Sequence, residues 1–268
     1  MSSIAPAEAW LAGHFAPVSL EVLNRKADML TRLDNKYIVS GATLRAAAPL
    51  LAEEFDILQI GASSAFDYAT CYFDTPDLRC FFDHHRGRRK RVKLRMRSYC
   101  GTDLCFLEVK LKDKRGVTVK RRLPQDPARF GRLDGAGMDY LRQSYHDQYG
   151  DEFDGPMSRV LDMRYRRMTL VARSGGERMT IDCDLRFRVQ DAMLSVGGDR
   201  FIVETKSANG NGLADRILRR LHQHPAARAS KYCMGMALTG AEVRFNRFLP
   251  ALRRLGPVSR ELIERKAA

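Results

Sequence analysis

The sequence Arg91-Val-Lys-Leu-Arg-Met-Arg97 alternates basic and apolar residues at every position. Successive side chains of a β-strand point to opposite faces, so this alternation predicts a strand with one cationic face and one apolar face. Two later segments, 106–112 and 117–123, repeat the pattern, and Arg115-Gly116 between them favours a hairpin turn. The stretch therefore predicts a sheet with one basic surface and one surface that packs on a core.

The polar side chains of these three strands share one face. By position they are Lys93, Arg95 and Arg97 on the first strand, Glu108, Lys110 and Lys112 on the second, and Thr118, Lys120 and Arg122 on the third. Like charges directly opposite each other destabilise a ladder, so we expect this face to bind an anion. The carboxylate of Glu108 among the cations indicates a site that also holds a metal ion.

Most of the positive charge of the chain lies in this region. The 268 residues carry a formal net charge of +14, and the stretch from Arg86 to Arg122 holds 15 basic and 3 acidic residues. Such an excess predicts a polyanionic partner, either a nucleic acid, an anionic lipid or a phosphate chain. The cationic faces lack the interleaved aromatic residues of single-strand stacking platforms, which argues against specific nucleic-acid binding.

Composition and patterning also bound the class of protein. With 44% hydrophobic and 29% charged residues, the chain is typical of a soluble globular protein and not of a fibre or a disordered chain. No apolar run approaches the roughly 18 residues of a membrane span, and residues 1–10 lack the pattern of a secretory signal. The six cysteines lack zinc-site spacing, so we expect free thiols and a cytoplasmic location.

Outside the basic stretch, alternation and capping signals predict five more strands and several helices. The strands are expected at 33–39, 66–73, 160–171, 178–189 and 201–207, and the helices at 20–30, 40–54, 137–149 and 213–223. Ser40 is the expected N-cap of the second helix, and Ser174-Gly-Gly176 favours a hairpin between 160–171 and 178–189. Glu204 and Lys206 share a strand face in the same way as Glu108 and Lys110. About eight strands with flanking helices predict an α+β fold built on a closed antiparallel β-barrel, in which one face of every strand points into the lumen.

Short motifs along the chain resemble, in order, those of the VTC domain. This is the catalytic domain of vacuolar transporter chaperone-type polyphosphate polymerases and their bacterial relatives, within the triphosphate tunnel metalloenzyme (CYTH-like) superfamily. The motifs are Arg32-x-Asp34-x-Lys36-Tyr, Tyr72-Phe-Asp-Thr-Pro, Lys93-x-Arg95-x-Arg97, Leu107-Glu-Val-Lys110, Lys120-x-Arg122, Tyr165-x-Arg167, Arg178-Met-Thr-Ile-Asp182, Glu204-x-Lys206 and Ser230-Lys-Tyr232. The resemblance divides the chain into an N-terminal extension (1–19), a tunnel domain (20–240) and a basic, helical C-terminal tail (241–268).

The resemblance implies a tunnel whose basic residues bind triphosphate or polyphosphate, with a divalent ion, Mn²⁺ or Mg²⁺. Matched by position, the implied catalytic residues are Arg95, Arg97, Lys110, Lys120, Arg167 and Arg178, and the further phosphate-binding residues are Lys36, Lys93, Arg122, Lys206, Arg228 and Lys231. Glu204 matches the metal-binding glutamate of the family, and Glu108 is the second metal candidate. Arg32 and Asp34 replace two glutamates of the wider superfamily, which argues against a thiamine triphosphatase or an adenylate cyclase.

The expected function is transfer of the ATP γ-phosphate to a growing polyphosphate chain. Two alternatives stay open: a triphosphatase that uses water as the acceptor, and a non-catalytic polyphosphate or nucleotide sensor. The expected ligands are ATP and polyphosphate or triphosphate. Any association with a membrane would need a separate membrane-protein partner.

Overall fold

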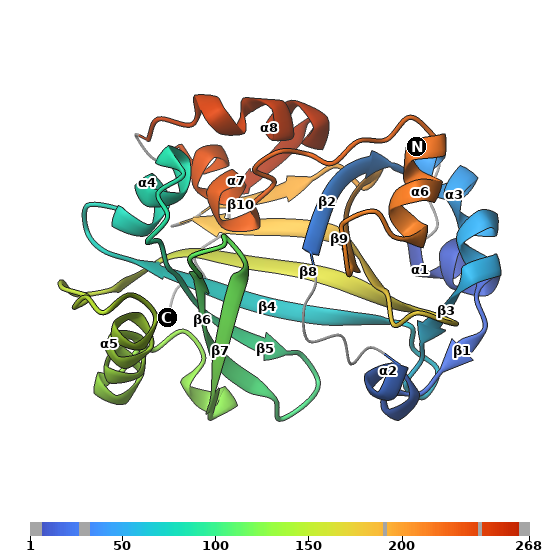
Figure 1. Ribbon diagram of the computed structural model, residues 1–268. Helices are drawn as coiled ribbons and strands as arrows, with labels where there is room; N and C mark the ends of the chain where they lie inside the picture. Colours follow the sequence, from blue (N-terminus) through green and yellow to red (C-terminus); the bar gives the residue numbers. More distant parts are fainter. Residues whose placement is uncertain (1–6, 27–32, 190–191, 241–242, 263–268) are drawn as a thin grey trace.

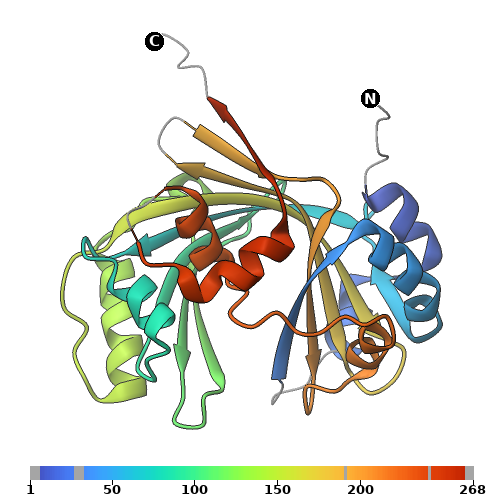
Figure 2. The same ribbon diagram turned by 90° about the horizontal axis from the view of Figure 1, so that it is seen from above.

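One curved antiparallel sheet organises the computed structural model, which describes residues 7–26, 33–189, 192–240 and 243–262 (Figures 1 and 2). Arg32 and residues 27–30 of the first predicted helix lie outside the described part. Eight strands follow one another across the sheet. In spatial order they are β2 (Leu33–Ser40), β11 (Arg200–Ser207), β9 (Arg178–Val189), β8 (Ser158–Ala172), β4 (Ala65–Asp74), β5 (Lys93–Tyr99), β6 (Cys105–Lys112) and β7 (Thr118–Gln125).

The α+β class and these eight strands confirm the sequence-based prediction, but the barrel is not closed by hydrogen bonds. Among the described residues no backbone pairing joins the edge strands β2 and β7, and the sheet forms an arch (Figure 2). Within the described ranges, β2 pairs only with β11 and β7 only with β6, so the ladder ends at these two edges.

Four short strands were not predicted from the sequence. They are β1 (Pro17–Val18), β3 (Phe55–Leu58), β10 (Ala192–Val196) and β12 (Val258–Leu262). Two to five residues give little periodicity, although Ala192, Leu194 and Val196 do alternate as buried residues in β10. The predicted helical tail is therefore corrected at its end: α8 (Leu249–Leu255) is helical, but β12 pairs with β10.

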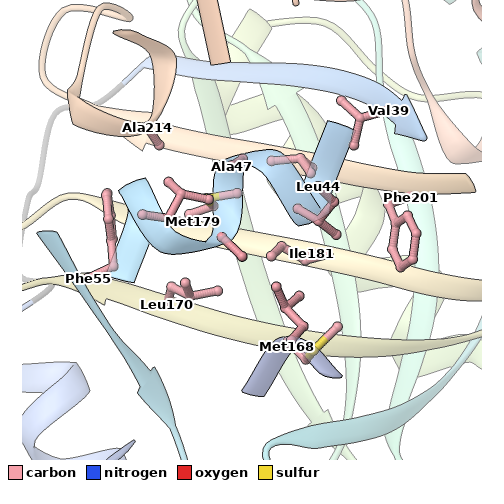
Figure 3. Packing of buried hydrophobic residues seen from close by; sticks show 14 of the residues in the cluster. Val39, Leu44, Ala47, Phe55, Met168, Leu170, Met179, Ile181, Phe201 and Ala214 are labelled. Atoms are coloured by element: carbon pink, nitrogen blue, oxygen red, sulfur yellow. The ribbon is translucent and has the colours of Figure 1, made fainter. Parts of the chain in front are cut away.

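Helices cover the convex face of the sheet in two places. On one side, α5 (Gly135–Tyr149) contributes Leu141 to a cluster that includes Leu94 and Leu107. On the other side, α1 (Ala7–Leu11), α3 (Gly41–Glu54) and α6 (Leu213–Arg220) pack on β2, β9 and β11 (Figure 3). Ser40 caps α3 as predicted, because its side chain accepts a hydrogen bond from the backbone N–H of Thr43. Leu11 belongs to this core, so the N-terminal segment packs with the domain.

Three helices cover part of the concave face. They are α4 (Arg79–Arg86), α7 (Lys231–Leu238) and α8. Phe81 of α4, Cys233 of α7 and Phe248 form one apolar cluster with Leu161 and Ile202 of the sheet. Figure 2 shows α7 and α8 against the concave side of the arch, and this cluster packs between the helices and the sheet.

Candidate functional site

The alternation in β5 has the predicted orientation. Leu94 and Met96 are completely buried in the cluster beneath α5, so Lys93, Arg95 and Arg97 face the concave side of the arch. The strand register sets further polar residues beside them. Arg95 lies opposite Glu108, and Glu108 opposite Arg122, while Lys93, Lys110 and Lys120 form a row of three facing lysines.

Glu108 is fully buried and joins cations from two neighbouring strands. Arg95 donates to its Oε2 through Nε at 2.6 Å and Nη2 at 2.5 Å, and Arg122 Nε donates to its Oε1 at 3.1 Å. Lys120 Nζ forms a further ion pair with Oε1. Burial would raise the pKa of Glu108, but Arg95, Arg97 and Lys120 hold it well below its usual value. The carboxylate therefore stays charged and fixes the positions of Arg95, Lys120 and Arg122.

Asp182 of β9 has the same role on the opposite wall. Arg167 of β8 donates to it through two nitrogens at 2.6 and 2.8 Å, and Lys231 of α7 forms an ion pair at 2.5 Å. Burial would raise the pKa of Asp182, but Arg167 and Lys231 lower it to about 2. Asp182 was not among the predicted site residues, although the sequence places it on the same strand face as Arg178 and Thr180 and in the motif that begins at Arg178.

Of Glu108, Asp182 and Glu204, the last, which belongs to β11, has the longest ion-pair distances. Lys206 Nζ lies 3.5 Å and Lys36 Nζ 3.9 Å from its Oε1. Burial would raise the pKa of Glu204, but Lys206, Lys36 and Lys110 hold it well below the usual value. Because Lys110 belongs to β6, this influence indicates that the two walls of the arch face one shared space. Lys206 also lies opposite Arg178 in the ladder.

A stacked tyrosine pair, not predicted from the sequence, supports the cations of the inner face. The rings of Tyr68 and Tyr165 lie 5.3 Å apart and are nearly parallel. The guanidinium of Arg97 lies 5.5 Å from the Tyr68 ring, and that of Arg167 lies 5.3 Å from the Tyr165 ring. Lys231 Nζ lies 5.4 Å from the Tyr165 ring. Cation–π attraction therefore helps to position three predicted phosphate ligands.

Several buried polar atoms of the inner face have no hydrogen-bond partner among the described residues. On strands β4, β5, β8 and β9 these atoms are Thr70 Oγ1, Arg97 Nε, Tyr165 Oη and Thr180 Oγ1. Leaving such a group unpaired costs roughly 1–3 kcal/mol, so sites of this kind commonly serve a ligand. Each of these atoms can donate a hydrogen bond, and phosphate oxygens accept them.

The far end of the inner face lies at Lys93, where α4 and α7 meet β5. Lys93 Nζ lies 2.9 Å from Ser230 Oγ and 3.1 Å from His84 Nε2. Burial lowers the pKa of Lys93 to about 8. Arg228 is not part of this group, because its exposed side chain donates through Nη1 to the backbone carbonyl of His85.

The carboxylates of the inner face differ in their fitness for a metal ion. In the part of the chain that the structure describes, no three His, Cys, Asp or Glu side chains gather as a metal site. Magnesium often binds through one or two carboxylates together with substrate phosphates. Both oxygens of Glu108 already accept from cations, whereas Glu204 has only the longer ion pairs. Glu204 therefore fits a divalent ion better than Glu108.

A family model and solved structures match this chain. The family model of the VTC domain matches residues 31–239. A Hippeastrum protein, named as an adenylyl cyclase and described with a dominant triphosphatase activity, aligns at a TM-score of 0.51 and 15% identity over 79% of this chain and 98% of that chain. A Bacillus halodurans protein named as an adenylate cyclase aligns at 0.49 and 14% identity over 75% and 95%. Among curated proteins, none matches the chain significantly. Within the described residues, no helix is long and apolar enough to span a membrane.

Proposed function

Because this chain belongs to the VTC domain family, we propose that it is an ATP-dependent polyphosphate polymerase, which transfers the γ-phosphate of ATP to the end of a growing polyphosphate chain. One observation carries the proposal. The inner face of the arch combines the buried Arg95 and Arg97 and several half-buried lysines with buried donors, among them Arg97 Nε and Tyr165 Oη, that have no partner among the described residues. A chain of phosphates offers both the negative charge and the acceptor oxygens that such a surface needs.

The cations lie on both walls of the arch. Lys36 and Lys206 belong to β2 and β11 on one wall, and Lys93 belongs to β5 on the other. This distribution supports simultaneous binding of a donor triphosphate and an acceptor chain.

In the proposed reaction, the bond between the γ-phosphorus and the oxygen that it shares with the β-phosphate breaks. A terminal oxygen of the chain forms a new bond to the same phosphorus, and ADP leaves with the electron pair of the broken bond. Arg95 and Arg167 stabilise the charge that spreads over the transferred phosphoryl group. Glu108 and Asp182 hold these two guanidiniums in place beforehand, so little reorganisation accompanies transfer.

A divalent ion, Mn²⁺ or Mg²⁺, is part of the proposal. Glu204 would hold it together with the substrate phosphates, and when bound the ion neutralises phosphate charge and orients the donor. We leave Glu108 out of this role, since a metal ion would have to displace Arg95, Lys120 and Arg122.

A triphosphatase is the second candidate, and the activity described for the Hippeastrum protein favours it. Hydrolysis requires a base that removes a proton from water. Glu108, Asp182 and Glu204 all have lowered pKa values, which makes them weak bases. An acceptor phosphate is already ionised and needs no base, so this difference favours the polymerase.

Incubation of the purified protein with ATP and Mn²⁺, followed by gel separation of the products, tests the proposal. Long chains support a polymerase, free phosphate without chains supports a triphosphatase, and binding without turnover supports a sensor. The Arg95→Ala protein, prepared in the same way, controls for contaminating kinases. The cytoplasmic location and a separate membrane-protein partner remain predictions.

A further inference from the structure

The inner face does not account for the whole basic stretch of the sequence. Between α4 and β5 the chain runs Arg86-Gly-Arg-Arg-Lys-Arg91, and Arg86 to Lys90 are exposed. This loop precedes Lys93, the end of the inner face, by only a few residues. Its cations therefore need a separate explanation.

The loop has a defined conformation. Gly87 adopts a left-handed φ of 75° where α4 ends, and the backbone N–H of Arg88 donates to the carbonyl of Asp83. Arg91 Nη1 donates to the carbonyl of Arg88 at 2.5 Å. These bonds hold the loop against the end of α4, so its cations project from a fixed base.

Two arginines from distant parts of the chain join the loop. Arg228 and Arg247 each donate through Nη1 to the backbone carbonyl of His85, at 2.8 and 3.1 Å. Cationic side chains at a helix C-terminus donate hydrogen bonds to its free carbonyls, and one nitrogen of each of these two guanidiniums does so here. The other guanidinium nitrogens are not needed for this contact. We call Arg86, Arg88, Arg89, Lys90, Arg228 and Arg247 the outer basic surface.

Few carboxylates balance this surface. Arg88 pairs with Asp83 at 3.5 Å, and Lys90 pairs with Asp151 at 2.5 Å. In the described part of the chain, Arg86 and Arg89 have no carboxylate within ion-pair distance. The surface therefore keeps a strong positive charge.

The outer basic surface is continuous with the inner face through His84. Its Nε2 lies 3.1 Å from Lys93 Nζ. Burial lowers the pKa of His84, and Lys93, Arg91 and Arg228 lower it further, so the imidazole stays neutral between two groups of cations. Figure 1 shows α4, which carries His84, beside α7 at one end of the arch.

We propose that the outer basic surface binds the part of a long polyphosphate chain that extends beyond the inner face. The inference rests on the proposed function and adds a chain-length preference to it. Contacts of this kind depend on charge and weaken with salt. A long chain can contact the inner face and this loop at the same time, so we expect the loop to contribute more to binding of a long chain than to binding of tripolyphosphate.

A double substitution of Arg86→Gln and Arg89→Gln tests the proposal, because it removes two charges without leaving a carboxylate unpaired. The matched control combines Arg220→Gln and Arg253→Gln. Both arginines are exposed, and their replacement removes the same amount of charge, from α6 and α8. Dissociation constants for tripolyphosphate and for polyphosphate of tens of residues are measured by calorimetry at low salt. We expect the test variant to bind the long chain at least about fivefold more weakly and tripolyphosphate within about twofold of wild type. The control should bind both ligands as wild type does.

Three results would overturn the inference. If the test variant binds the long chain as tightly as wild type, the loop is not part of the binding surface. If the variant loses equal affinity for the long chain and for tripolyphosphate, the substitutions act on the inner face or on folding. An oligonucleotide of similar charge that competes equally well for the loop would make it a general polyanion surface. If wild-type protein binds neither phosphate ligand, the proposed function itself fails, which is a different outcome.

Discussion

Replacing Asp182 by asparagine should destabilise the protein strongly, because Asp182 is the buried counter-charge of Arg167 and Lys231. The side chain of Asp182 is fully buried, and that of Arg167 is 13% exposed. Since each pKa unit is worth about 1.4 kcal/mol, lowering the pKa of Asp182 from 3.8 to about 2 corresponds to about 2.5 kcal/mol. Breaking a buried ion pair from one side costs about 3–5 kcal/mol. We therefore expect Asp182→Asn to lose about 3 kcal/mol of unfolding free energy at pH 7.

Strand β8, which carries Arg167, offers a matched control. Its Arg159 donates to Asp162 through two nitrogens at 2.7 and 2.5 Å, but this pair is partly exposed, with 44% and 25% of the two side chains accessible. Asp162→Asn should therefore cost no more than about 1 kcal/mol. Urea unfolding, followed through the single Trp10, which packs edge-on against Phe201, compares the two variants with wild type.

The pH dependence gives a second readout. A carboxyl group whose pKa is lower in the folded state than in the unfolded state stabilises the protein at pH values above the unfolded-state pKa. This contribution disappears as the pH falls through the folded-state pKa. The difference between wild type and Asp182→Asn should therefore shrink from pH 4 to pH 2. If Asp182→Asn unfolds within about 0.5 kcal/mol of Asp162→Asn at pH 7, the argument that Asp182 is a desolvated counter-charge is wrong.

Three further predictions concern the inner face. Arg95→Ala or Arg97→Ala should reduce phosphate transfer by at least about a hundredfold with normal circular dichroism; wild-type rates in both variants would remove β5 from the site. Glu204→Gln should still bind triphosphate but lose its response to Mn²⁺, and an unchanged Mn²⁺ titration midpoint would contradict a metal role. Leu94→Ala should cost about 2–5 kcal/mol of unfolding free energy, whereas Arg97→Met should leave it within about 1 kcal/mol of wild type or raise it; the opposite ranking in urea would reverse the orientation of β5.

Local patterns predicted much of the fold because they depend on neighbours in the sequence. The period of two in residues 91–97 sets Leu94 on the core side and Arg95 on the concave side, whatever the strand pairs with. The hairpin of β8 and β9 and the cap at Ser40 are also local features, and both are confirmed. The short strands β1 and β3 are too brief to show a period, so they were missed.

The sequence alone determined which residue types face the concave side, because side-chain direction in a strand follows from the backbone period. Only the tertiary structure decided how those side chains combine. Glu108 meets Arg95 and Lys120 through the register of three strands. Asp182 meets Lys231 because α7 lies across the arch, 49 positions later in the chain. Register, curvature and the packing of a distant helix depend on contacts across the whole chain, and for the same reason the gap between β2 and β7 could not be predicted from any single strand.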